Sequence, residues 1–367
     1  MRLFAIVLTA CVAACDLFAA ETARQPPPPN VVIVPLPNAF SVIRHPTLPV
    51  LYVGCEGSPE SKNLVTFRLE SDGSLAAGSQ RICDDYLSPD GKKPSFKHRF
   101  HRPAVNVEKG ILYLAGYPIV DNSSITYSNT NNFEYSAVAL DEQGQPAKRL
   151  KLFRCDITGQ QGLMGIRYLP AFRRLFLTYY TTFSWLELDG TGLPTTEKTQ
   201  WIHGPHTIWE WLYVREWDRY YANRGGNELA IFQLKAEIPQ STFVQMVTTD
   251  RKCPCPSDIE VSPKYHKLYL LDGAPGRELF VHSLDAQGRL IGLPRSFLLG
   301  PIAMLRCDFK AGLLYAFTKE ALKVFKLDAD GSLSGPPQVH PLGYGDINDV
   351  CLDETTGKLY VACTKPL

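Results

Sequence analysis

The sequence lacks the charge excess that marks a nucleic-acid-binding protein. Its 367 residues include 38 Lys and Arg and 37 Asp and Glu, so the formal net charge is +1. Binding to a phosphate backbone needs a concentrated basic surface, and the sequence has no basic tail or acidic run. We therefore expect no nucleic-acid partner. The chain is 45% hydrophobic, which is enough for a large core and excludes global disorder.

Several catalytic and cofactor signatures are also missing. The sequence contains no G-x-S-x-G nucleophile elbow, no Walker phosphate loop, no H-E-x-x-H and no G-x-G-x-x-G that opens a helix. The absence of C-x-x-C-H excludes covalent haem at that motif. No segment sustains a 3.6-residue apolar period between caps, which excludes a helical fold. Beyond the N-terminus, no apolar run approaches the ~20 residues of a membrane-spanning helix.

The N-terminus has the form of an export signal. Arg2 precedes a 12-residue apolar run, Leu3–Ala14, which is too short to span a membrane. Phe18-Ala19-Ala20 fits ordinary signal cleavage, whereas Val12-Ala13-Ala14-Cys15 resembles a bacterial lipobox that would leave Cys15 lipidated. Both endings stay open. We expect a signal peptide over residues 1–20 and a Pro-rich tether over residues 21–30, and we expect a periplasmic or extracellular protein whose only membrane contact is the candidate lipid anchor.

The cysteines agree with export but do not define a site. Two of the ten, Cys11 and Cys15, fall in the signal, which leaves eight in the folded part. An oxidising compartment permits disulfides, although the sequence does not give their pairing. The alternative is that they are small buried hydrophobic residues. Cys253-Pro254-Cys255 is too tightly spaced for a zinc site.

A repeat is the main signal in the sequence. A short apolar strand with a central aromatic residue recurs at Leu51-Tyr52-Val53, Leu112-Tyr113-Leu114, Leu175-Phe176-Leu177, Tyr220-Tyr221-Ala222, Leu268-Tyr269-Leu270, Leu314-Tyr315-Ala316 and Leu359-Tyr360-Val361. A second alternating strand follows in most units, for example Leu64–Leu69, and then an acidic-glycine turn such as Asp72-Gly73. Residues 31–367 therefore predict an all-β fold, a seven-bladed β-propeller with four-stranded antiparallel blades.

The N-terminal and C-terminal ends of the predicted propeller are expected to form one blade together. The last unit ends soon after its second strand, at Leu367. Its missing outer strands are expected from Val31–Pro35 and Phe40–Ile43, which would close the ring and remove exposed sheet edges. Two long insertions, residues 84–102 and 117–133, fall on connections that emerge on the same face of the disc. Such loops either bind a partner or are decoration.

One unit resembles a known family of propellers. His45-Pro46-Thr47-Leu48-Pro49-Val50-Leu51-Tyr52-Val53 and the later Phe67–Leu75 are similar to the signature blade of the lactonase-type seven-bladed propellers, which include bacterial 6-phosphogluconolactonase and the fungal carboxymuconate cyclases. The resemblance covers Val31–Leu367. It implies a catalytic cluster in the central channel, made of a His on blade three, an Arg in Gly-Pro-Arg-His, a Glu in Asn-Glu and a further Arg on the next blade.

This chain carries other residues at those positions. His206 follows Gly204-Pro205 where the resemblance implies Arg, and Arg224 follows Asn223 where it implies Glu. Blade five reads Asp258-Ile259-Glu260, with Glu260 in place of a His. The further Arg would fall around Asp272-Gly273, and blade three offers Leu163–Ile166 with no His. These replacements predict that lactone hydrolysis is altered or absent.

Polar residues on the inner strands are the candidates for a site. Those expected in the channel or at its mouth are His101, Arg102, Asn106, His206, Glu210, Asp258, Glu260, Arg306, Asp308, Asn348 and Asp349. Catalytic candidates are His206, Arg224, Glu260 and Arg306, with Glu260 and Arg306 singled out as a pair; ligand-binding candidates are His101, Arg102, Asp258, Asp308 and Asp349. We expect no metal or resident cofactor, although facing carboxylates can hold a divalent cation. The alternative is that these groups are hydrated and pair with one another.

Two hypotheses about function remain. In the first, an exported lactonase-like propeller binds a small anionic or sugar-derived ligand at the channel; His206, Arg224 and Glu260 should then lie within about 10 Å of one another, the size of a ligand site. In the second, a non-enzymatic scaffold binds protein or polysaccharide through its long loops and through Trp201, Trp209, Trp211 and Trp217. Those Trp side chains can equally be core. We expect a monomer in either case.

Overall fold

The structure is a computed structural model of the whole chain. It describes residues 30–34, 36, 39–55, 64–83, 101–116, 132–156, 163–179, 183–196, 200–202, 208–224, 228–235, 238–248, 258–271, 278–300, 302, 304–318, 321–342 and 347–363. The signal peptide, the tether except Asn30, and the two long insertions lie outside the described residues apart from their ends in strands. In the described part, no helix is long and apolar enough to cross a membrane.

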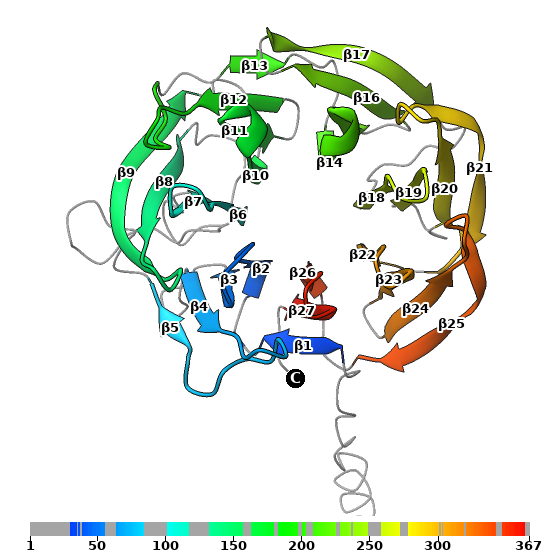
Figure 1. Cartoon of the computed structure of the whole chain (residues 1–367), viewed down its shortest axis with the longest axis horizontal. Coiled ribbons are helices and arrows are strands. Elements are labelled where there is room, and N and C mark those ends of the chain that lie inside the picture. The colour runs from blue at the N-terminus through cyan, green and yellow to red at the C-terminus, as the bar shows by residue number, and fades with distance from the viewer. Residues whose placement is uncertain are drawn as a thin grey trace, which may run out of the picture.

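Seven small sheets stand in a ring around a central axis, so the predicted seven-bladed propeller is confirmed (Figure 1). From the axis outward, the strands of blades one to three are, in turn, β2(Ala39–Arg44), β3(Val50–Cys55), β4(Leu64–Arg68) and β5(Arg81–Ile82); β6(His101–Asn106), β7(Ile111–Gly116), β8(Asn132–Leu140) and β9(Pro146–Asp156); and β10(Leu163–Leu169), β11(Arg174–Tyr179), β12(Phe183–Glu187) and β13(Gln200–Ile202). The strands of blades four to six are, in the same order, β14(Ile208–Val214), β15(Arg219–Arg224), β16(Glu228–Lys235) and β17(Ile238–Thr248); β18(Asp258–Ser262), β19(Lys267–Leu271), β20(Glu278–Leu284) and β21(Leu290–Leu298); and β22(Met304–Asp308), β23(Leu313–Phe317), β24(Ala321–Leu327) and β25(Leu333–Pro341). Blade seven holds β26(Ile347–Asp353), β27(Lys358–Cys363) and then β1(Val31–Val34).

The N-terminal strand closes the ring, as predicted, but only one of the two expected segments takes part. β1 pairs with β27, with Val31 opposite Leu359, and the pairing is parallel. The prediction for Phe40–Ile43 was wrong, because these residues lie in β2, the innermost strand of blade one. The parallel direction follows from the topology. Only four residues connect β1 to β2, so β1 must end close to the start of β2. It therefore runs in the direction of the fourth strand of a blade, which is parallel to the second strand, although it occupies the third position.

The hydrophobic core consists of seven clusters, one between each pair of neighbouring blades. Second strands are buried on both faces: in β3, Leu51 and Val53 pack toward blade seven, and Tyr52 packs toward blade two. A second strand therefore reads as a continuous apolar run, because a blade stands on each side of it.

In five blades the repeated tyrosine links the blade to the next one. The hydroxyl of the central Tyr of a second strand donates to the carbonyl of the turn glycine in the following blade: Tyr52 to Gly144 at 2.6 Å, Tyr113 to Gly192 at 2.7 Å, Tyr221 to Gly288 at 2.7 Å, Tyr269 to Gly331 at 2.6 Å and Tyr360 to Gly73 at 2.9 Å. All five glycines have positive φ, which other residues adopt only with strain. The Tyr and the acidic-glycine turn of the repeat thus supply the donor and the acceptor of the same interblade hydrogen bond.

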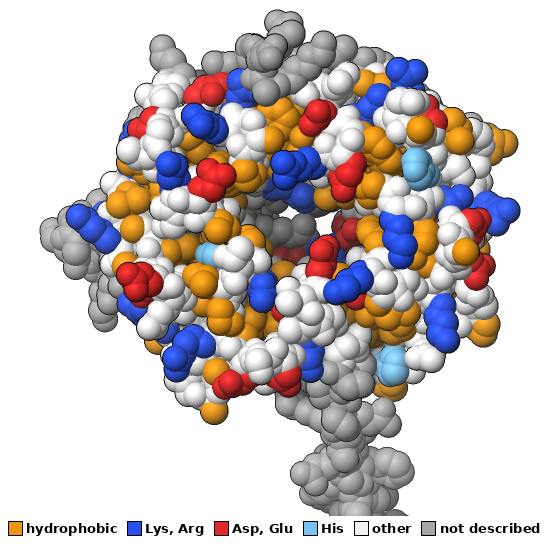
Figure 2. Space-filling model, viewed as in Figure 1, with side chains coloured by type: hydrophobic (Ala, Val, Ile, Leu, Met, Phe, Trp, Pro, Cys, Tyr) orange, Lys and Arg blue, Asp and Glu red, His pale blue; other side chains and the backbone are white. Residues whose placement is uncertain are grey.

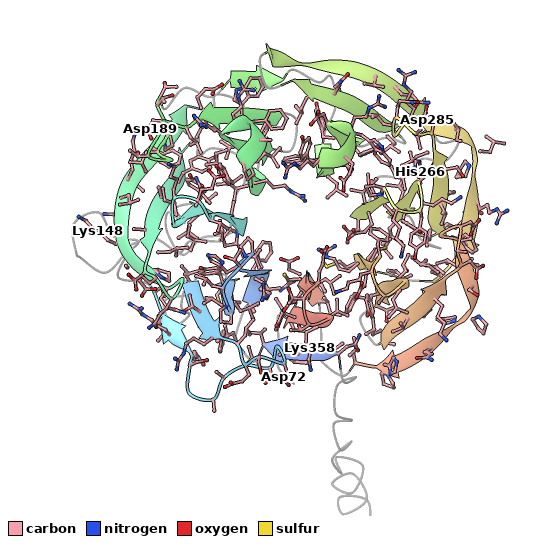
Figure 3. The ribbon with its side chains drawn as sticks, viewed as in Figure 1. Asp72, Lys148, Asp189, His266, Asp285 and Lys358 are labelled. Atoms are coloured by element: carbon pink, nitrogen blue, oxygen red, sulfur yellow. The ribbon has the colours of Figure 1, made fainter. Side chains whose placement is uncertain are left out.

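Two blades, three and six, lack this bond between the Tyr hydroxyl and a turn glycine. Blade three has Phe176 in place of the Tyr, and the turn that it would reach, between β16 and β17, contains no glycine in its sequence. Blade six has Tyr315, whose hydroxyl instead accepts a hydrogen bond from the Asn30 side chain at 3.1 Å, next to the closing strand. Figure 3 shows the acidic residues of three such turns, Asp72, Asp189 and Asp285, around the disc, with Asp72 beside Lys358 of blade seven.

Two further expectations about side chains can be compared with the structure. Trp211 is buried among Phe176 and Tyr220 between blades three and four, which supports the core interpretation at that position; the side chains of Trp201 and Trp209 lie outside the described residues. Four cysteines in the described part, Cys55, Cys83, Cys307 and Cys363, are buried.

Candidate functional site

Seven inner strands form the wall of the central channel. These are β2, β6, β10, β14, β18, β22 and β26, one from each blade (Figure 1). The space-filling view shows an opening at the centre of the disc, with acidic and basic side chains around it (Figure 2). Side chains from adjacent inner strands can therefore meet at this wall although these strands begin 43 to 62 residues apart in the sequence.

Arg306, in the middle of β22, is the centre of the polar cluster in the channel. Its Nη1 lies 2.7 Å from Oδ2 of Asp258 and 3.7 Å from Oε1 of Glu260, both on blade five. Its Nη2 lies 3.5 Å from Oδ1 of Asp349 on blade seven. The guanidinium also donates to two backbone carbonyls, Val350 at 2.8 Å and Leu305 at 2.6 Å. One side chain therefore connects the inner strands of three consecutive blades.

Two of these carboxylates also bind the backbone of the neighbouring blade. Oδ2 of Asp258 accepts the N–H of Leu305 at 2.9 Å. In the same way, Oδ2 of Asp349 accepts the N–H of Val42 across the ring closure at 2.9 Å. Charge-assisted bonds of this kind are stronger than neutral ones, and both carboxylates are nearly buried, so their positions are fixed.

Glu260 is the member of the cluster that is open to the channel. Its side chain is 18% exposed, compared with 12% for Arg306, 5% for Asp258 and 3% for Asp349. Three carboxylates and one guanidinium have a formal charge of −3 + 1 = −2. These carboxylates give this part of the wall acceptor oxygens, which suit the hydroxyl groups of a ligand.

Other polar residues of the inner strands of blades six and seven make contacts outside this cluster. Asp308 is at the end of β22, where its Oδ1 accepts the N–H of Ala311 in the following turn at 2.8 Å. Asn348 donates to the carbonyl of Ala39 at 2.8 Å, and Asp353 binds Nε of Arg44 at 2.9 Å. The last two contacts join blade seven to blade one. Sequence reasoning did not single out Asp353 or Arg44, whose partnership depends on ring closure.

The opposite side of the channel carries basic residues and one acidic candidate, Glu210 of β14, in its sequence. His101 and Arg102 are in β6, and Arg224 is in β15, the second strand of blade four, opposite Ile208 and Glu228; the side chains of all three lie outside the described residues. His206 also lies outside them, so the predicted proximity of His206, Arg224 and Glu260 stays a prediction. Arg167 of β10 is described, and its guanidinium lies 4.9 Å from the centre of the Trp211 ring.

A small pocket lies away from this cluster, between blades two and three. Its volume is about 110 Å³, and its lining includes Asn106, Glu108, Lys109, Tyr168, Arg173 and Asp189. Typical ligand pockets are several times larger, about 300–1,000 Å³. The pocket fits a few waters, and we do not assign the ligand site to it. The described part of the chain also contains no three His, Cys, Asp or Glu side chains placed to hold a metal ion.

Comparisons with known proteins identify the architecture. No family model matches the sequence, and no curated protein matches it significantly. Among solved structures, the periplasmic gluconolactonase PpgL of Pseudomonas aeruginosa is similar, with a TM-score of 0.62, 11% identity and 89% of each chain covered. A Bacteroides uniformis protein, assigned provisionally as a 6-phosphogluconolactonase, has a TM-score of 0.61 and 15% identity over 84% of this chain and 89% of that one. A Lactobacillus plantarum protein has a TM-score of 0.60 and 16% identity over 86% of this chain and 96% of that one. At these identities the likeness concerns the fold, a lactonase-like seven-bladed propeller.

Proposed function

We propose that this protein is an exported lactonase-like propeller that binds a small sugar-derived ligand at its central channel. The observation that carries the proposal is the set of three carboxylates held around Arg306 on adjacent inner strands. A similar structure belongs to a gluconolactonase, which acts on a sugar lactone, and this supports the ligand class. A fold alone does not define a function, so the chemistry of the channel wall has to support the assignment.

The wall offers fixed acceptors for hydroxyl groups. The Glu260 side chain is the most exposed of the three carboxylates, whereas Asp258 and Asp349 are held by Arg306 and by backbone N–H groups. Rigid acceptors lose little entropy when they bind, which favours a polyhydroxylated ligand. If the ligand also carries a carboxylate, we propose that this group faces blades two to four, where Arg102 and Arg167 lie on the inner strands.

We propose that binding occurs without the hydrolysis expected of the family. Arg306 contacts three carboxylates and donates to two carbonyls, so its guanidinium is not available to polarise a lactone carbonyl. The chain also has His206, Arg224 and Glu260 where the resemblance implies Arg, Glu and His. Such replacements remove the groups that would stabilise a developing oxyanion or move a proton.

Calorimetric titration with gluconate and with glucono-1,5-lactone tests this function. We expect saturable binding to the wild-type protein and about tenfold weaker binding to Glu260→Gln, because one charged acceptor is lost. Glu354→Gln, an exposed carboxylate in the turn between β26 and β27, serves as the matched control and should bind normally. Absence of binding, or equal losses in both variants, would favour the scaffold hypothesis. Lactone hydrolysis above the spontaneous rate would refute the proposed loss of catalysis.

The proposed export has a separate test. Expression in a Gram-negative host followed by fractionation and mass spectrometry of the mature N-terminus should find the protein outside the cytoplasm. A chain that begins after Ala20 indicates ordinary cleavage, and a lipid-modified Cys15 that is lost in Cys15→Ser indicates the anchor. A full-length cytoplasmic chain that begins at Met1 contradicts export.

A further inference from the structure

Blade seven is one strand short in the described part of the chain. The other six blades have four strands each, whereas blade seven has β26, β27 and β1. β1 therefore occupies the third position and forms the outer edge of its sheet (Figure 1). A sheet edge with free backbone groups can accept another strand.

The hydrogen-bond pattern shows which backbone groups point away from the blade. The N–H of Leu359 donates to the carbonyl of Asn30 at 2.7 Å, and Val31 lies opposite Leu359 in a parallel pair. In a parallel ladder, alternate residues turn both their N–H and C=O toward the partner strand. Val32 and Val34 thus bond to β27, and Val31 and Ile33 direct two N–H and two C=O groups outward.

This edge is recessed between its neighbours. The blades on each side have fourth strands, β25 and β5, whereas blade seven ends at its third strand. Strands in a sheet are about 4.8 Å apart, so the edge of β1 lies about one strand inside the rim. Two copies of the protein would each present a recessed edge, and their β1 strands could not meet. One extended segment fits this position.

The surroundings of the edge are apolar on the side of blade one and polar on the side of blade six. β1 consists of Val31-Val32-Ile33-Val34. On the side of blade one, Ile82 is 43% exposed and lies opposite Val65 in β5–β4 pairing, on the face where Val65 packs with Tyr360 of blade seven. On the side of blade six, His340 and Gln338 of β25 lie opposite Leu322 and Val324, which pack toward blade seven. A strand in the fourth position would cover Ile82, so β-branched, uncharged side chains match its face toward blade one.

Most other outer strands are protected against strand addition. Among the six described fourth strands, β5, β9 and β21 carry charged residues, and β9, β17, β21 and β25 contain proline; β13 has neither. Proline and charge are the common means of blocking an edge. β1 has neither device within the strand.

We propose that the fourth position of blade seven is a strand-addition site that binds one extended, uncharged segment of a partner protein, rich in β-branched residues and antiparallel to β1. The site is separate from the channel, and it lies on the rim of the disc. The partner supplies donors and acceptors for Val31 and Ile33, and its side chains cover Ile82 on one face.

The test uses the full chain and a capped, fluorescent hexapeptide of alternating Val and Thr, with fluorescence anisotropy as the readout. We expect saturable binding to the wild-type protein and about tenfold or weaker binding to Ile33→Pro, which removes an outward N–H but leaves the bonds to β27. Ile82→Lys should also weaken binding, because it places a charge beside the strand. Leu293→Lys, at a side chain 94% exposed on blade five, is the matched control and should bind like wild type.

Several outcomes would overturn the proposal. These are no binding to the wild-type protein, or equal binding to Ile33→Pro when its thermal midpoint shows that it is folded. Slow hydrogen exchange of both the Val31 and Ile33 amides in the free, full chain would show that another segment of this chain already occupies the position. A dimer that dissociates in Ile33→Pro would assign the edge to a second copy.

Discussion

Removal of one interblade hydroxyl offers a direct test of how the propeller is held together. In Tyr269→Phe, the ring remains in the interface of blades five and six, but the bond from the hydroxyl to the carbonyl of Gly331, 2.6 Å long, is lost. Tyr269 is fully buried, and burial raises the pKa of its hydroxyl, so the group is a neutral donor throughout the ordinary pH range. The substitution therefore isolates one hydrogen bond in a dry interface.

The expected cost follows from the environment of the two atoms. A typical hydrogen bond contributes about 1 kcal/mol net, and an acceptor left unsatisfied in a buried interface costs about 1–3 kcal/mol. We expect Tyr269→Phe to lower the free energy of unfolding by about 1–3 kcal/mol. Tyr52, Tyr113, Tyr221 and Tyr360 make the same contact and should give similar losses.

Urea unfolding followed by tryptophan fluorescence measures this loss, and blade three supplies the control. Phe176→Tyr adds a hydroxyl where the following turn has no glycine, so it should give no gain in stability. The reasoning is refuted if Tyr269→Phe changes the free energy of unfolding by less than about 0.5 kcal/mol, the ordinary range for neutral substitutions. It is refuted equally if Phe176→Tyr stabilises the protein.

Three further predictions concern stability. Gly288→Ala should lower the free energy of unfolding by about 2–4 kcal/mol, because φ is +73° and the new Cβ would lie 2.5 Å from Trp217; Gly78→Ala, with φ of +65° and open space, should cost about 1–2 kcal/mol in the same urea titration. Arg306→Met should cost about 3–5 kcal/mol by leaving buried carboxylates without a counter-charge, and Arg306→Lys should cost less, as thermal and urea unfolding can measure. His282 is buried, and burial lowers its pKa to about 4 from 6.5. In the folded protein the neutral imidazole is therefore favoured over the charged one by about 3 kcal/mol relative to the unfolded chain. This contribution to the free energy of unfolding is complete above pH 6.5 and is lost as the pH falls toward 4. Unfolding measured from pH 8 to pH 4 should show a shallower decline in His282→Leu than in wild type, and identical slopes would contradict this assignment.

Much of the fold could be predicted because its signals are local. The Tyr-centred strand and the acidic-glycine turn recur along the chain, and the period-2 pattern between them places most strands. The count of seven blades and the use of Val31–Val34 to close the ring follow from these repeats. The assignment of Phe40–Ile43 to the same blade was wrong, because a short apolar strand does not reveal which of two adjacent sheets it joins.

The candidate site could be predicted only in part. Asp258, Glu260, Arg306 and Asp349 were selected as polar residues on inner strands, and the structure brings these four together. Their partners could not be read from sequence, because alternate residues of an inner strand point to different neighbouring blades. Asp308 was grouped with them, but it lies at the end of β22, where its carboxylate binds its own turn.

The sequence alone determined the all-β type of the fold and the number of blades, since those depend on residue patterns within a few positions. Only the tertiary structure decided that five of the repeated Tyr residues bind the turn glycine of the next blade and that Arg306 joins three inner strands. It also decided that β1 pairs in parallel and is the outermost strand of blade seven in the described part of the chain. These features arise where the faces of neighbouring blades meet. Which residues touch there depends on how each blade is rotated about the axis, and no local sequence pattern specifies that rotation.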